Sequence, residues 1–181
     1  MKSKVKYLLI SLTVIIFIGL TILANYMYTS ARKIMPMSHV YVCDNPAEDS
    51  EFDVWMKNEL GLNWVPTYLI IRNDYVIGTI RGGIPESQFT SELGTILINN
   101  WQIAELPNIE ISNVNGERQV LADVLPNNDS FYILEISWVD CPDCIFQDEN
   151  FTEDVYLEYG TNIIYRYYIH STQEEVLAKY E

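Results

Sequence analysis

Cysteine is scarce in this chain, and acidic residues are missing from its first segment. Three cysteines in 181 residues are too few for a disulfide-dense scaffold. No aspartate or glutamate precedes Asp44, and only six of the 11 basic residues follow Lys33. The chain beyond Lys33 therefore sets six basic against 25 acidic side chains. A surface of that sign repels nucleic acid and anionic headgroups, so we exclude both as its partners.

Apolar residues, in contrast, are plentiful. Hydrophobic residues make up 49% of the chain and aromatic residues 13%, which is enough for a real core and excludes a disordered chain. The length suits one ordinary domain with an appendage.

The appendage is an uncharged run over residues 7–24, which is long enough to cross a bilayer as a helix. Three lysines precede the run and only two basic residues follow it closely, which favours a cytoplasmic N-terminus. A cleaved signal peptide is the competing interpretation, but no small-x-small cleavage site follows the run. We predict a single uncleaved anchor in residues 1–33 of a bacterial cell-membrane protein. Both interpretations place residues from about 38 onward outside the cytoplasm.

Apolar spacing predicts two groups of strands and helices in the remaining chain. The first group consists of strand 40–43, helix 48–60, strands 68–71 and 75–80, and helix 86–97. A polar linker follows around residues 99–105. The second group consists of a hairpin that turns at Asn115-Gly116, strand 131–136, a helix beyond Cys144, strand 162–169 and a helix that begins near Thr172. This alternation indicates the α/β class.

A Cys-x-x-Cys motif, Cys141 to Cys144, closely follows the apolar strand 131–136. This order places both sulfurs at the start of a helix, where backbone N–H groups and the helix dipole favour a thiolate. The same spacing also begins zinc sites, for which Cys43 and His170 are the other available ligands. We expect no metal or other cofactor, and we interpret Cys43 as a small apolar residue in a strand.

Residues 61–93 resemble the C-terminal half of a thioredoxin. They contain Gly-x-x-x-Val-Pro-Thr, an apolar strand, a polar turn, a second strand, Gly82 and a helix. In that family the proline of Val-Pro-Thr is cis and packs against the active-site disulfide, and the preceding residue presents its backbone to an extended substrate. The resemblance gives these roles to Pro66 and Val65, with Trp64 beside them in the docking surface.

Residues 106–144 resemble the start of the redoxins, the membrane-tethered thioredoxins of cytochrome maturation and their relatives. The resemblance implies that Cys141 is an exposed nucleophile and Cys144 the resolving thiol. Where the family places tryptophan directly before the first cysteine, this chain has Asp140, with Trp138 three positions before Cys141. Because Asp140 and Asp143 are negative, they oppose a thiolate on Cys141. We therefore expect a reductant or isomerase rather than a strong oxidant.

Glu135 lies within the strand that precedes the motif, six positions before Cys141. The thioredoxin resemblance aligns it with a buried acid that takes the proton of the resolving thiol, here Cys144. Our hypothesis is that Glu135 has a raised pKa and acts in this way. The other interpretation is a buried carboxylate that a tyrosine hydroxyl or a backbone group satisfies.

The two resembling halves stand in reverse order, with 38–98 carrying Val-Pro-Thr and 106–181 carrying Cys-x-x-Cys. We predict a circularly permuted thioredoxin-like domain over 38–181; a swapped homodimer and two partial tandem domains are the alternatives. Strands 40–43 and 162–169 both suit the same position in that sheet.

The expected function is that of a membrane-anchored extracytoplasmic thiol-disulfide oxidoreductase, whose substrates are disulfide-containing proteins or peptides. The alternative is a redox-inactive binding or accessory protein for an exported disulfide-containing peptide.

Overall fold

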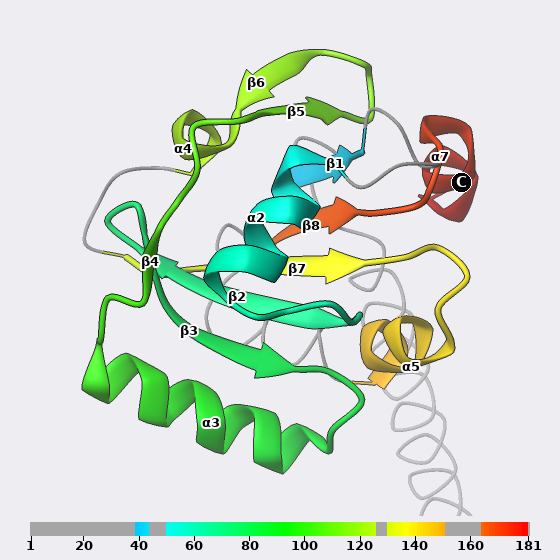
Figure 1. Cartoon of the computed structure of the whole chain (residues 1–181). Helices are drawn as coiled ribbons and strands as arrows, with labels where there is room; N and C mark the ends of the chain where they lie inside the picture. The colour runs from blue at the N-terminus through cyan, green and yellow to red at the C-terminus, as the bar shows by residue number, and fades with distance from the viewer. Residues whose placement is uncertain (1–38, 44–49, 126–129, 151–163, 181) are drawn as a thin grey trace, which may run out of the picture. The chain divides into compact units, whose positions relative to one another are not determined.

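A mixed β-sheet runs through the part of the chain that the structure describes (Figure 1). The structure is a computed structural model, and it describes residues 39–43, 50–125, 130–150 and 164–180. The elements of these residues are β1 (Val40–Val42), α2 (Glu51–Glu59), β2 (Thr67–Arg72), β3 (Tyr75–Arg81), α3 (Glu86–Asn99), β4 (Ala104–Glu105), β5 (Glu110–Asn113), β6 (Arg118–Val120), α4 (Leu121–Val124), β7 (Tyr132–Ser137), α5 (Pro142–Asn150), β8 (Ile164–Tyr168) and α7 (Gln173–Tyr180). The α/β class predicted from the sequence is thereby confirmed.

In the described residues the sheet has eight strands in the order β4-β3-β2-β7-β8-β1-β5-β6. Strands β7, β8 and β1 run parallel to one another, and every other neighbouring pair is antiparallel. The two edge strands, β4 and β6, have two and three residues. Short edges offer little backbone to another chain.

Local signals in the sequence account for the ends of several elements. Ser50 caps α2: its hydroxyl accepts the backbone N–H of Asp53, whose carboxylate accepts the backbone N–H of Ser50. This capping box satisfies N–H groups that the first turn leaves unpaired. At the Asn115-Gly116 turn, Gly116 has φ +80°, which suits the predicted hairpin of β5 and β6. The hairpin prediction is confirmed, whereas the helix predicted to begin at residue 48 begins at Glu51.

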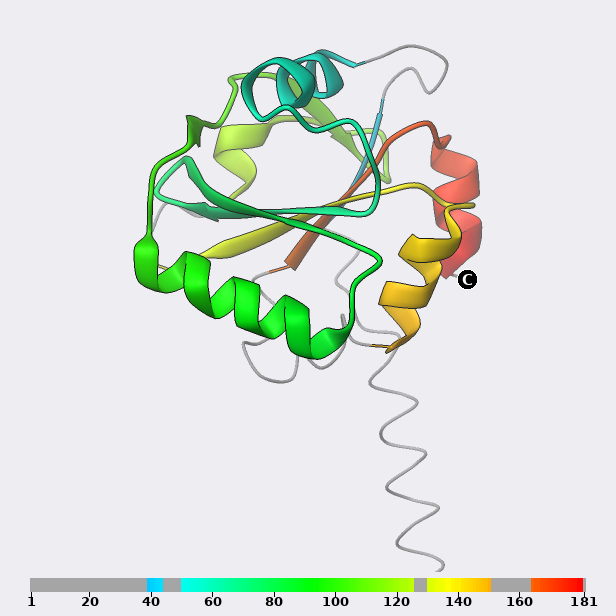
Figure 2. The same cartoon turned by 60° about the horizontal axis from the view of Figure 1, so that its bottom comes forward.

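Helices cover both faces of the sheet (Figure 2). One face packs α2 and α4 against a large cluster that includes Leu134 and Ile136 of β7. The other face carries α3, whose Phe89 and Leu93 pack with Ile133 of β7. Because side chains alternate along a strand, Glu135 lies on the same face of the sheet as Ile133.

The strands predicted to compete for one position lie side by side instead. β8 pairs in parallel with β7 on one side and with β1 on the other. Both segments therefore fit, because the sheet extends beyond β8 rather than ending there. The predicted linker around 99–105 is also partly wrong, since β4 lies within it and pairs with β3.

The predicted anchor, residues 7–24, lies outside the described residues. Among those that are described, no helix has the length and apolar character needed to cross a membrane.

Candidate active site

Cys141 and Cys144 form a disulfide at the start of α5, with their Cα atoms 5.2 Å apart. Pro142 is the first residue of the helix, a position where the missing N–H of proline costs nothing. The backbone N–H of Cys144 donates to the sulfur of Cys141 at 3.2 Å. That N–H and the helix dipole both favour negative charge on the Cys141 sulfur once the disulfide is reduced.

The two cysteines differ in accessibility in the direction expected, but both are buried. Cys141 is 6% exposed and Cys144 is 0% exposed. An exposed Cys141 was expected; the sulfur is instead turned toward Cys144 and its amide, with the disulfide closed. A substrate would reach the Cys141 sulfur before the Cys144 sulfur.

The Val65–Pro66 peptide bond is cis, as the thioredoxin resemblance implies. Pro66 directly precedes β2, whose first residue, Thr67, pairs with Ile136 near the end of β7. The Cys-x-x-Cys motif follows the same end of β7. The cis bond and the disulfide therefore lie at the same end of the central strands, where β2 begins and β7 ends, although they come from distant parts of the sequence.

A pair of glycines connects the proline loop to the cysteine helix. Gly82 donates its backbone N–H to the Pro66 carbonyl at 2.8 Å, and the proline ring occupies the space that a side chain at position 82 would need. Gly83 has φ +73°, and a Cβ built on it would lie 3.4 Å from a carboxylate oxygen of Asp143. Gly82 thus contacts Pro66, and its neighbour Gly83 lies close to Asp143 in the first turn of α5.

Gln147 fixes α5 to the rest of the domain. Its side chain is fully buried, donates to the Ile84 carbonyl at 3.1 Å and accepts from the Tyr68 hydroxyl at 3.2 Å. Sequence reasoning missed this residue. The available signal was a glutamine three positions after Cys144, on the same face of an amphipathic helix.

Two tryptophans singled out from the sequence, Trp64 and Trp138, lie partly exposed. Trp64 is 38% exposed, and the Arg81 guanidinium lies 4.5 Å from its ring centroid. Trp138 is 42% exposed, and its ring lies edge-on to that of His170, with the ring centroids 6.4 Å apart. The Trp138 carbonyl accepts the backbone N–H of Cys141 at 3.2 Å.

Acidic side chains surround the cysteine pair, as the sequence indicates. Asp140 and Asp143 are both exposed, so solvent weakens their repulsion of a Cys141 thiolate. The buried Cys144 N–H, 3.2 Å from the Cys141 sulfur, acts in the opposite sense.

Glu135 is fully buried and paired with an arginine. Arg166 of β8 is its neighbour in register and donates to one carboxylate oxygen from Nε at 2.9 Å and from Nη2 at 2.7 Å. Arg166 also donates to the Tyr180 hydroxyl at 2.9 Å. An opposite charge, the Arg166 guanidinium, therefore compensates the buried carboxylate.

The alternative metal ligands do not come together with the motif. Cys141 and Cys144 are bonded to each other, Cys43 is buried at the end of β1, and His170 lies in the turn after β8. Within the described ranges, no group of three or more His, Cys, Asp or Glu side chains is placed to hold a metal ion.

Comparison with protein-family models, curated proteins and solved structures gave no match to this chain.

Proposed function

We propose that this chain is a membrane-anchored, extracytoplasmic thiol-disulfide oxidoreductase that acts as a reductant or isomerase through Cys141 and Cys144. The observation that carries the proposal is the disulfide in the first turn of α5, with the Cys144 N–H donated to the Cys141 sulfur. The Cys144 N–H helps the outer cysteine to form the thiolate that attacks a disulfide. The neighbouring carboxylates of Asp140 and Asp143 oppose that thiolate, which favours a reductant or isomerase over a strong oxidant.

The reaction starts from the reduced dithiol. The Cys141 thiolate attacks one sulfur of a substrate disulfide, so that a Cys141–substrate bond forms and the other substrate sulfur leaves as a thiolate. The Cys144 thiolate then attacks Cys141, which closes the Cys141–Cys144 disulfide and releases the second substrate thiolate. Two electrons pass to the substrate, and an external dithiol returns the pair to the reduced form.

A thioredoxin-like fold in permuted order agrees with the topology. β7, α5 and β8 make a parallel strand-helix-strand unit with Cys-x-x-Cys at the start of its helix, the context in which this motif is read as thioredoxin-like. The half that contains Pro66 pairs through β2 with β7 of the same chain. This pairing supports one permuted domain over a swapped homodimer or two partial domains.

A redox-inactive binding protein is the second candidate. It is favoured by the 6% exposure of Cys141, which limits attack on a bulky disulfide. Trp64 and Trp138 would then serve as a docking surface for an exported disulfide-containing peptide.

Reduction of insulin by dithiothreitol, with and without the full chain, separates the two candidates. We expect the parent chain to accelerate precipitation of the insulin B chain and Cys141→Ala to abolish the acceleration. Cys43→Ala is the matched control, because Cys43 is also buried but lies outside the disulfide, and it should stay active. An acceleration that survives in Cys141→Ala would refute the proposed site, and an inactive parent would favour the binding protein.

A further inference from the structure

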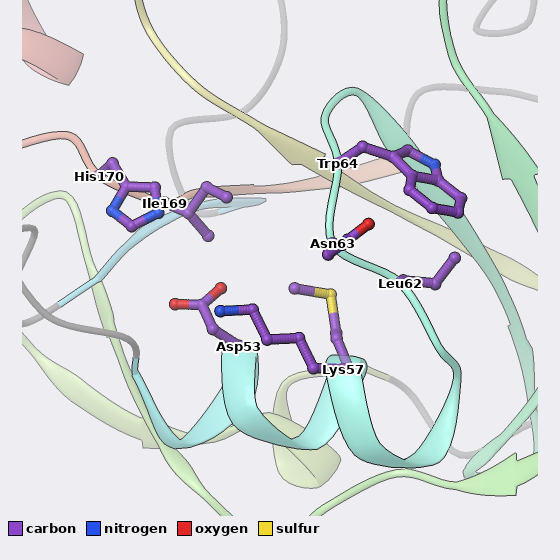
Figure 3. Close-up of a pocket in the computed structure, with 8 residues that line it drawn as sticks. Asp53, Lys57, Leu62, Asn63, Trp64, Ile169 and His170 are labelled. Atoms are coloured by element: carbon purple, nitrogen blue, oxygen red, sulfur yellow. The ribbon is translucent and has the colours of Figure 1, made fainter.

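A cavity of about 100 Å³ lies between α2 and two loops of the candidate site (Figure 3). One loop leads into β2 and the other follows β8. The cavity is lined by Asp53, Met56, Lys57, Leu62, Asn63, Trp64, Ile169 and His170. None of the roles discussed above uses it.

Each loop is linked to a part of the candidate site. Trp64 precedes Pro66 by two residues. On the other side, the His170 ring contacts the ring of Trp138 at 6.4 Å, and the Trp138 carbonyl accepts the Cys141 N–H. The cavity is thus linked to Cys141 through His170 and Trp138, and to the Pro66 loop through Trp64.

The lining indicates which kind of guest the cavity would accept. Met56 and Leu62 are buried and, with Ile169, give the cavity apolar walls. Asp53 and Lys57 lie on successive turns of α2 and carry opposite charges, and Figure 3 shows both side chains extending from α2 toward the loop with His170. Because the two charges compensate each other, a charged guest gains little there, and an uncharged apolar guest is favoured.

The polar end of the cavity is already fixed. The Asp53 carboxylate accepts from the backbone N–H of Ser50 at 2.9 Å and from its hydroxyl at 2.7 Å. A carboxylate held in this way needs no hydrogen bond from a guest. Selection would then depend on apolar contact and size.

We propose that this cavity receives an aliphatic side chain, of valine to leucine or methionine size, next to the reacting cysteine of a disulfide-bearing peptide. The proposal rests on the function proposed above and adds a substrate preference to it. An apolar cavity of about 150 Å³ is known to hold a benzene ring. A cavity of about 100 Å³ therefore favours aliphatic over aromatic side chains.

The test uses the reduced full chain and short peptides whose single cysteine is joined to thionitrobenzoate. Attack by Cys141 forms a Cys141–peptide disulfide, and the coloured thionitrobenzoate thiolate leaves with the electron pair. The residue before or after the peptide cysteine is varied through Gly, Ala, Val, Leu, Phe, Lys and Asp. The symmetric thionitrobenzoate disulfide serves as a probe that has no peptide side chain.

We expect Val or Leu on one side of the cysteine to raise the second-order rate constant about 10- to 100-fold over Gly, with Phe, Lys and Asp close to Gly. Asn63→Trp should fill the cavity from its exposed rim and remove the preference for Val and Leu, while the symmetric probe still reacts with Cys141. Asn58→Trp is the matched control, because Asn58 is exposed on α2 and does not line the cavity; it should keep the preference.

Two results overturn the inference in distinguishable ways. Equal rates for Gly and Leu peptides, with the symmetric probe still reacting, would remove the cavity from substrate selection and leave the proposed function intact. No reaction of Cys141 with either kind of probe would refute the proposed function and the role of the cavity with it.

Discussion

Removal of the Glu135 carboxylate should destabilise the domain strongly. Glu135 is 0% and Arg166 5% exposed, and two hydrogen bonds of 2.9 and 2.7 Å join them. Glu135→Leu leaves the Arg166 guanidinium buried without its counter-charge, and breaking a buried pair from one side costs about 3–5 kcal/mol. Since a domain is stable by only about 5–15 kcal/mol, we expect a large fraction of the folding free energy to be lost.

Replacement of both partners should restore most of that loss. In the double variant Glu135→Leu with Arg166→Met, neither charge of this buried pair remains, and such replacements are often neutral or stabilising. The Tyr180 hydroxyl loses Arg166 but keeps the Tyr168 hydroxyl, 3.0 Å away. We therefore expect the double variant to be more stable than Glu135→Leu by at least about 2 kcal/mol.

Urea unfolding of the parent, both single variants and the double variant measures the coupling. The free energy of unfolding follows from the midpoint and slope of each curve, and an unchanged slope shows that the same surface is exposed. The reasoning fails if Glu135→Leu changes the free energy of unfolding by less than about 1 kcal/mol, or if the losses of the single variants add in the double variant.

The double variant also isolates the proton-transfer role of Glu135. Glu135→Leu alone confounds lost catalysis with lost stability, whereas the double variant lacks the carboxylate in a domain expected to fold. If it exchanges disulfides at the parental rate, Glu135 serves the fold and does not take the proton of Cys144. A slower second step, seen as accumulation of the Cys141–substrate disulfide, would support the relay.

Three further predictions concern the contacts that hold the site and the sheet. Gly82→Ala places a methyl group against the Pro66 ring and should cost about 1–3 kcal/mol in urea unfolding, whereas Gly94→Ala in α3, with open space around its Cβ, should be neutral or stabilising; equal effects would disprove the proline contact. Ser50→Ala removes the cap of α2 and should lower the free energy of unfolding by about 1 kcal/mol, and no change would argue against the cap. Burial lowers the pKa of His39 from its ordinary value of 6.5, so folding disfavours the protonated imidazole and the free energy of unfolding falls as the pH drops below 6.5. His39→Gln should weaken this pH dependence of the urea midpoint between pH 7.5 and 5; a dependence equal to that of the parent would refute the prediction.

Features with local causes were predictable from the sequence. The capped start of α2, the hairpin at Asn115-Gly116 and the helix that begins at Pro142 each depend on residues a few positions apart. Such signals depend on residues that are neighbours in the sequence, so tertiary packing does not change them. The same holds for the apolar run that became β7.

Features that depend on register between distant segments were not predictable. The partner of Glu135 is Arg166, 31 positions away, because β7 and β8 pair in a parallel register that the sequence does not display. Gln147 likewise contacts Tyr68, 79 positions away. Periodicity predicts which segments form strands and helices, but it does not say what each side chain contacts.

The reversed order of the halves matters less than the edge at which their strands end. β7, β8 and β1 run parallel. Their carboxyl ends therefore lie on one side of the sheet, and Cys141, His170 and Cys43 follow those ends. β2 is antiparallel to β7 and therefore begins at that edge, which is where Pro66 stands. Ligands of open α/β sheets bind outside the carboxyl ends of the strands. A chain that traces the halves in either order delivers these residues to the same edge, because strand pairing, not connectivity, positions the proline loop beside the cysteine helix.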